Sequence, residues 1–120
     1  MKKIKNANTH PIRIERVDGS IFEYPPSGDS FRLETEDRVI DEINGNPIIQ
    51  RVYYEPDTDV VPRYEEGVYH IVPSQITQLY SREDFISPDT KQAHGARRSS
   101  NGQVLSVKRF RMHDILITKE

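Results

Sequence analysis

The stretch IRIERVDGSIFEY, residues 12–24, decides the fold class of this chain. Apolar and polar residues alternate on both sides of Asp18, which is the pattern of two half-buried β-strands joined by a turn. A three-residue loop that ends at Gly19 sets Ile14 opposite Phe22, so that apolar side chains share one face. The same loop puts Gly19 in the left-handed position, where the missing Cβ removes the steric cost. Residues 12–24 therefore predict a β-hairpin.

Further strands are expected on either side of this hairpin. Alternating polarity, or runs of β-branched and aromatic residues, occur at 31–34, 67–72, 104–110 and 115–117, and around a turn at 44–47. A four-residue loop at that turn sets Ile43 opposite Ile48, which keeps apolar residues together. The same register sets Val39 opposite Val52.

One helix is expected, and it is short. Pro73 precedes it, and Ile76, Leu79 and Tyr80 follow at the spacing of one helical face. At 120 residues the chain has room for one hydrophobic core. We therefore predict a single domain over residues 1–120, mainly β, with the architecture of a small sandwich or barrel and one short helix.

The composition limits the classes of function. Hydrophobic residues make up 34% of the chain and charged residues 30%, which is polar but still typical of a folded protein. The absence of cysteine excludes disulfides, thiolate nucleophiles and thiolate metal ligands. The basic start at residues 1–6 lacks the apolar run of a signal peptide, and no stretch approaches the roughly 20 apolar residues that span a bilayer. We expect a cytoplasmic protein.

Charge is distributed unevenly along the chain. Residues 91–113 contain no Asp or Glu but carry six Lys or Arg residues, and because the whole chain has a net charge of −2, the rest carries −8. This split is poorly suited to coating a nucleic acid and favours a local anion site on an acidic body, or else a solvated basic face.

Two residues near this segment are candidates for ligand binding. Arg109 continues the face of Leu105 and Val107 in the strand expected at 104–110, so its guanidinium is expected where a sheet meets a cleft and can hold a phosphate. The alternative is an ion pair with one of the acids elsewhere. Phe85 lies at the start of a long polar loop and can stack on a base, or it can be an ordinary core residue.

Features of an enzyme are missing from the sequence. The four histidines are scattered without a second ligand at metal spacing, Ser27 lacks the context of a nucleophile elbow, and there is no Gly-rich phosphate loop. We expect a binding protein without catalytic residues, metal or cofactor.

Four short segments resemble a family of small phage proteins. They are NTHPI at 8–12, PPSG at 25–28, VYHIV at 68–72 and NGQVL at 101–105. In these segments the chain is similar to the type 1 Thoeris anti-defence proteins. The resemblance implies a decorated Tudor-like β-fold, a homo-oligomer with a pocket near a subunit interface, and a role in the cytoplasm of an infected bacterium. It also implies binding of glyco-cyclic ADP-ribose, and in some members of cyclic oligonucleotides, which are sequestered and not cleaved.

The resemblance also suggests which residues contact the ligand. Arg32, Phe85 and Arg109 match best, and Arg63, Arg97 and Arg98 are further candidates. The basic segment 91–100 departs from the family pattern. Two other classes of function stay open at this point: a structural or assembly protein of a phage particle, and an RNA- or DNA-binding module whose affinity would fall steeply with salt.

Overall fold

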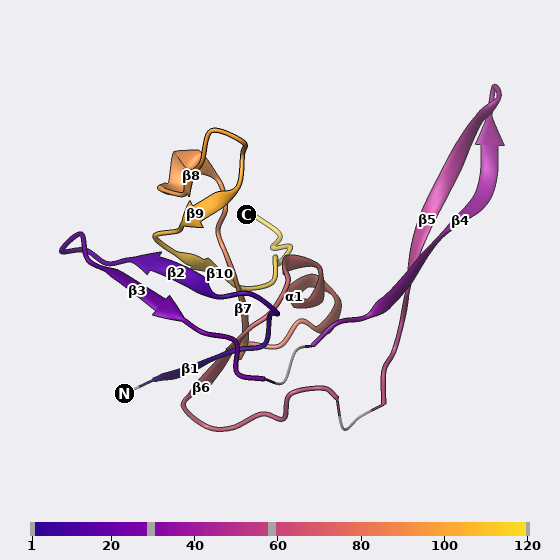
Figure 1. Ribbon diagram of the computed structural model, residues 1–120. Helices are drawn as coiled ribbons and strands as arrows, with labels where there is room; N and C mark the ends of the chain where they lie inside the picture. The colour runs from indigo at the N-terminus through magenta and orange to yellow at the C-terminus, as the bar shows by residue number, and fades with distance from the viewer. Residues whose placement is uncertain (1, 29–30, 58–59, 120) are drawn as a thin grey trace. The chain divides into compact units, whose positions relative to one another are not determined.

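The computed structural model describes residues 2–28, 31–57 and 60–119. The chain divides into two compact units, the first formed by residues 1–30 and 63–120 and the second by residues 31–62 (Figure 1). The first unit contains β1 (Lys3–Asn6), β2 (Ile12–Glu15), β3 (Ile21–Tyr24), β6 (Val68–Ile71), α1 (Ser74–Tyr80), β7 (Phe85–Pro88), a 3-10 helix (Gln92–His94), β8 (Arg97–Arg98), β9 (Val104–Ser106) and β10 (Phe110–Arg111). The second unit contains β4 (Glu34–Ile43) and β5 (Asn46–Tyr54). The prediction of a mainly β chain with one short α-helix is confirmed.

The largest sheet has four strands in the order β1-β6-β7-β10. β6 runs parallel to both β1 and β7, and β10 is antiparallel to β7. The connection from β6 to β7 contains α1, as a parallel pair requires a crossover between its strands. The buried cluster of Ile12, Ile71 and Ile86 joins this sheet to β2.

The hairpin of β2 and β3 has the register predicted from the sequence. Ile14 pairs with Phe22, the Arg16 N–H donates to the Ser20 carbonyl at 2.8 Å, and Gly19 has a φ of +88°. Only glycine adopts this backbone conformation without steric cost, so the turn chemistry and the alternation of the strands agree.

α1 begins where the sequence predicts, directly after Pro73. Its buried residues are Ile76 and Thr77, whereas Leu79, which we expected on the buried face, is 48% exposed. The buried stripe is therefore rotated by one position from the predicted one. No helix within the described residues is long and apolar enough to cross a membrane.

The second hairpin, β4 with β5, corrects the predicted register. Asn44 and Gly45 both have positive φ, 51° and 85°, which gives a two-residue turn with Ile43 opposite Asn46. These angles are those of a type I′ turn, whose twist matches the flanking strands. A bulge between Val39 and Asp41 then shifts the pairing. β4 also begins only at Glu34. The strand predicted at 31–34 is therefore wrong over residues 31–33.

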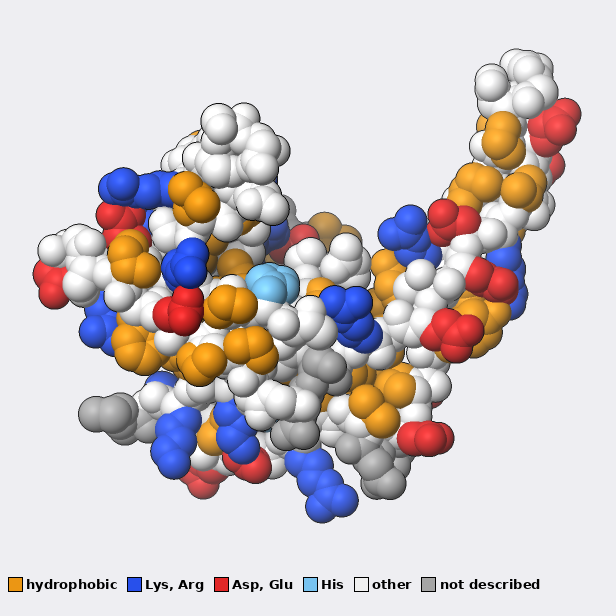
Figure 2. Space-filling model, in the orientation of Figure 1, with side chains coloured by type: hydrophobic (Ala, Val, Ile, Leu, Met, Phe, Trp, Pro, Cys, Tyr) orange, Lys and Arg blue, Asp and Glu red, His pale blue; other side chains and the backbone are white. Residues whose placement is uncertain are grey.

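The predicted pairing of Ile43 with Ile48 and of Val39 with Val52 is thus wrong. The reason is that the side chains of this hairpin are mostly exposed to solvent. Every residue of β4 is exposed, and so are most of β5. Figure 2 shows hydrophobic and charged side chains interleaved along this ribbon. No buried face exists to impose the pairing of apolar residues, so the turn sets the register.

The single strand predicted at 104–110 is broken in two. The Val107 N–H donates to the Arg13 carbonyl at 3.0 Å, and the Val107 carbonyl accepts from the Glu15 N–H at 2.8 Å. Three pairings therefore follow one another along this segment. β9 pairs with β8, Val107 then bonds to the edge of β2, and β10 pairs with β7. Residues 115–117, expected as an edge strand, form no strand.

Candidate functional site

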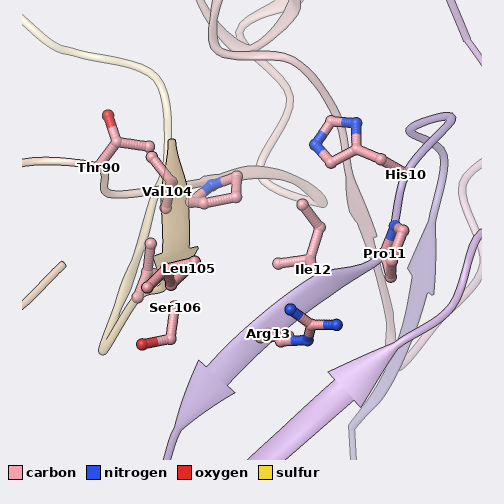
Figure 3. Close-up of a pocket in the computed structure, with 10 residues that line it drawn as sticks. His10, Pro11, Ile12, Arg13, Thr90, Val104, Leu105 and Ser106 are labelled. Atoms are coloured by element: carbon pink, nitrogen blue, oxygen red, sulfur yellow. The ribbon is translucent and has the colours of Figure 1, made fainter. Parts of the chain in front are cut away.

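A pocket of about 190 Å³ opens where the start of β2, the end of β7 and β9 meet (Figure 3). Its apolar lining residues are Pro11, Ile12, Pro88, Val104, Leu105 and Val107, and its polar ones are His10, Arg13, Thr90 and Ser106. Figure 3 shows His10 on one side of the pocket and Thr90 with Val104 on the other. The pocket thus combines apolar walls with a few polar groups, as small-molecule sites do.

The two walls are held together by backbone hydrogen bonds. Val107 bonds Arg13 and Glu15 of β2 as described above, so the β9 side cannot separate from the β2 side without breaking them. The His10 end is held by Asn6, which is only 2% exposed. The Asn6 Nδ2 donates to the carbonyls of His10 and Tyr24, each at 2.9 Å. Both sides of the pocket are therefore held by hydrogen bonds within the protein.

Asp89 organises the segment that follows β7. Its carboxylate is 1% exposed, and one oxygen accepts from Arg109 Nε at 2.6 Å and from His94 Nδ1 at 2.7 Å. The other oxygen accepts from the Lys91 N–H at 3.2 Å. Burial raises the pKa of the Asp89 carboxyl, but the hydrogen bonds from Arg109, Lys91 and His94 outweigh it and lower the pKa to about 2.

The ionised Asp89 also determines the tautomer of His94. A carboxylate can only accept, so the proton must lie on His94 Nδ1. Arg109 Nη2 lies 2.8 Å from the same Nδ1, but a protonated nitrogen has no lone pair for it. Arg109 is therefore bound through Nε to Asp89.

Arg98 has a different environment from its neighbours. Its Nη1 donates to the Gly102 carbonyl at 2.8 Å and its Nη2 to the Thr90 carbonyl at 3.0 Å. By contrast, Arg97 pairs with Glu15 at 2.9 Å. No carboxylate in residues 2–28, 31–57 and 60–119 pairs with Arg98. Its guanidinium is held in place by neutral carbonyls, keeps its full charge, and retains N–H donors for a ligand.

The position of Arg98 connects it to the pocket. Thr90, whose carbonyl holds the guanidinium, lines the pocket, and Arg98 pairs with Val104 of β9, another lining residue. Arg98 is not itself a lining residue, but its guanidinium is bonded to the backbone of one lining residue and its strand pairs with another.

The structure changes the interpretation of the two strongest sequence candidates. Arg109 forms the ion pair that was the alternative to a phosphate contact. Phe85 is 0% exposed, and its ring packs edge-on against His70 and Tyr80 with centroid distances of 6.1 and 5.8 Å. A ring without exposed surface cannot stack on a base, so Phe85 is a core residue in this structure.

None of the other candidates is a lining residue of the pocket. Arg32 is exposed and belongs to the second unit. Arg63 is exposed, and its carbonyl is 3.2 Å from His70 Nε2. Arg98 and Arg109 come together in the first unit because they bind the consecutive residues Thr90 and Asp89, and Arg97 is the neighbour of Arg98 in β8.

None of the ten lining residues, among them His10, Pro88 and Thr90, was predicted as a site residue from the sequence. The Asp89-Thr90 pair after a strand, a typical turn signal, is the only local feature that points to them. Within the described ranges no group of three His, Asp or Glu side chains is placed to hold a metal ion.

Charges over the visible face of the first unit are interspersed rather than gathered in one large basic patch (Figure 2). Glu15 accounts for part of this, because it pairs with Arg97 and lies 3.7 Å from Lys108. Most cations of the basic segment 91–113 are therefore paired with acids, whereas the Arg98 guanidinium is held by backbone carbonyls. No protein-family model matches the chain, and no curated protein or solved structure matches it.

Proposed function

We propose that the chain binds a cyclic nucleotide signal and sequesters it without cleaving it. One observation carries this proposal: Arg98 is fixed by two backbone carbonyls beside an apolar pocket and has no carboxylate partner in the described part of the chain. A fixed guanidinium binds a phosphate with little loss of side-chain entropy, and apolar walls suit the base or ribose attached to that phosphate.

Sequestration fits the rest of the site. Holding a ligand requires affinity and no stabilisation of a transition state. Asp89, the buried carboxylate next to the lining residue Thr90, is already engaged by Arg109 and His94. We therefore propose a non-enzymatic binding protein.

The resemblance to the type 1 Thoeris anti-defence proteins extends the proposal. On that basis the bound signal is glyco-cyclic ADP-ribose, or a cyclic oligonucleotide, and the protein acts in the cytoplasm of an infected bacterium. We also propose a homo-oligomer, because the apolar side chains of residues 115–117 are between 70% and 102% exposed and a second copy would cover such a surface. Light scattering that shows only a 14.0 kDa monomer at micromolar concentration would remove the oligomer from the proposal.

The experiment for the function itself is a capture assay. The purified protein is incubated with a mixture of cyclic mono-, di- and oligonucleotides and glyco-cyclic ADP-ribose, washed, and heated, and the released molecules are identified by mass spectrometry. We expect one of these nucleotides to be released chemically intact. An empty protein would contradict binding, and linear products that grow in proportion to protein concentration would show an enzyme instead.

A further inference from the structure

The shape of the pocket indicates which part of a nucleotide it holds. On one side lies the imidazole of His10, and facing it across the pocket are Val104 and Thr90 (Figure 3). Pro88 also lines the pocket. A flat heteroaromatic ring stacks on surfaces of this kind, because aromatic and apolar side chains contact its faces while its polar edge stays near water or hydroxyl groups.

The size of the pocket limits the ligand to one ring system. Its volume is about 190 Å³, below the roughly 300–1,000 Å³ of pockets that bury drug-sized ligands. One nucleobase fits such a space, whereas a whole dinucleotide does not. The remainder of a larger nucleotide must extend out of the pocket.

The charges around the pocket indicate where the phosphate lies. Arg13 also lines the pocket, but its Nε donates to Glu23 at 3.0 Å, so its charge is offset in part. Arg98 is held to the carbonyl of Thr90, a lining residue, and has no acidic partner among the described residues. A phosphate next to a base in the pocket therefore gains more from Arg98 than from Arg13, whose charge Glu23 already offsets in part.

We infer that the pocket is a subsite for one nucleoside phosphate unit, with the base between His10 and the wall of Val104 and Thr90 and the phosphate on Arg98. This inference rests on the proposed nucleotide binding and adds to it the residues and the part of the ligand that each one recognises.

Three small probes separate the two contacts. Adenosine carries the base alone, ribose 5-phosphate carries the phosphate alone, and AMP carries both. Binding is followed by titration with 15N-1H NMR spectra, which localise each probe through the amide shifts of residues 10, 12, 13 and 104–107. We expect AMP to bind tightest, and adenosine to shift these amides without the phosphate.

Variants then assign each contact to a side chain. The His10 side chain makes no hydrogen bond to any described residue, so His10→Ala should fold. We expect His10→Ala to weaken the binding of AMP and of adenosine about tenfold, which is the effect of one lost stacking contact. The binding of ribose 5-phosphate should be unchanged. Arg98→Gln should weaken AMP and ribose 5-phosphate by about tenfold or more and leave adenosine unchanged. The matched control is Arg97→Gln, which removes a neutralised guanidinium and should change none of the three.

The outcomes also separate this inference from the proposed function. Two results would overturn the assignment of base and phosphate. One is that His10→Ala loses ribose 5-phosphate binding, and the other is that both variants weaken the binding of adenosine and ribose 5-phosphate equally. If the capture assay yields a cyclic nucleotide but AMP and adenosine shift amides elsewhere, the subsite is wrong while the function stands. If these probes bind as expected but no cyclic nucleotide is captured, the subsite stands and the function is wrong. Dispersed spectra of each variant confirm that it is folded.

Discussion

Replacing Asp89 by Asn tests the buried cluster that positions Thr90 and, through its carbonyl, Arg98. The change keeps the shape of the side chain and its acceptor for the Lys91 N–H, but removes the charge that Arg109 and His94 bind. We expect the variant to fold and to be less stable than the wild type at neutral pH.

The magnitude follows from the pKa of Asp89, which is 3.8 for a free carboxyl and about 2 in the folded protein. A shift of this size corresponds to about 2.5 kcal/mol of stability. The Arg109 side chain is 56% exposed, so solvent screening reduces the expected loss to about 1–2 kcal/mol.

The sign of the pH dependence is determined by the direction of the shift. Because folding lowers the pKa, the stabilisation by Asp89 is complete above pH 3.8 and is lost as the pH falls through about 2. The difference in unfolding free energy between wild type and Asp89→Asn should therefore be largest at pH 7, fall to about half at pH 3 and nearly vanish at pH 2.

Urea denaturation at these pH values measures the difference directly. The control is Asp114→Asn, because Asp114 pairs with Arg111 while remaining 69% exposed, and it should change stability little at any pH. A difference for Asp89→Asn that is independent of pH, or no difference at pH 7, would refute the role given to this ion pair.

Two further substitutions test local packing by thermal and urea unfolding. Gly95→Ala should lower the free energy of unfolding by about 1–3 kcal/mol, because φ is +94° and the new Cβ would lie 2.5–3.2 Å from side-chain carbons of Lys108. Gly102→Ala is the control, since φ is +86° but no atom lies within 4 Å of the new Cβ, and it should lower stability less. Equal losses would contradict a steric contribution from Lys108. Phe85→Ala should lower the free energy of unfolding by about 3–5 kcal/mol, as for a buried aromatic residue. Phe22→Ala should lower it less, because the Phe22 side chain is 39% exposed, and the reverse order would contradict a core role for Phe85.

The sequence predicted elements whose structure is decided locally. The hairpin at 12–24 has both a turn that requires Gly19 and strands that bury one face, so two independent signals agree on one register. The second hairpin has the turn signal of Asn44-Gly45 but no buried face. Pairing apolar residues with each other was the wrong criterion there, because exposed strands do not impose it.

The candidate site could be predicted only in part, because it depends on long-range contacts. The pocket joins residues 10–13, 88–90 and 104–107, which meet through the bonds of Val107 to β2. No local pattern reports these bonds. The same limit applies to the arginines: all six cations of segment 91–113 look alike in the sequence, and only the structure shows that Arg109 is neutralised while Arg98 is not.

Titration calorimetry with cyclic di-AMP and with the nucleotide identified by capture tests the central claim most directly. We predict that the wild type and Arg97→Ala bind alike, and that Arg98→Ala binds more weakly by about 1.5–3 kcal/mol, the range for a hydrogen bond to a charged group. The ligand should be recovered intact after each titration. Unchanged affinity in a folded Arg98→Ala variant would contradict the account, because the phosphate would then be held elsewhere.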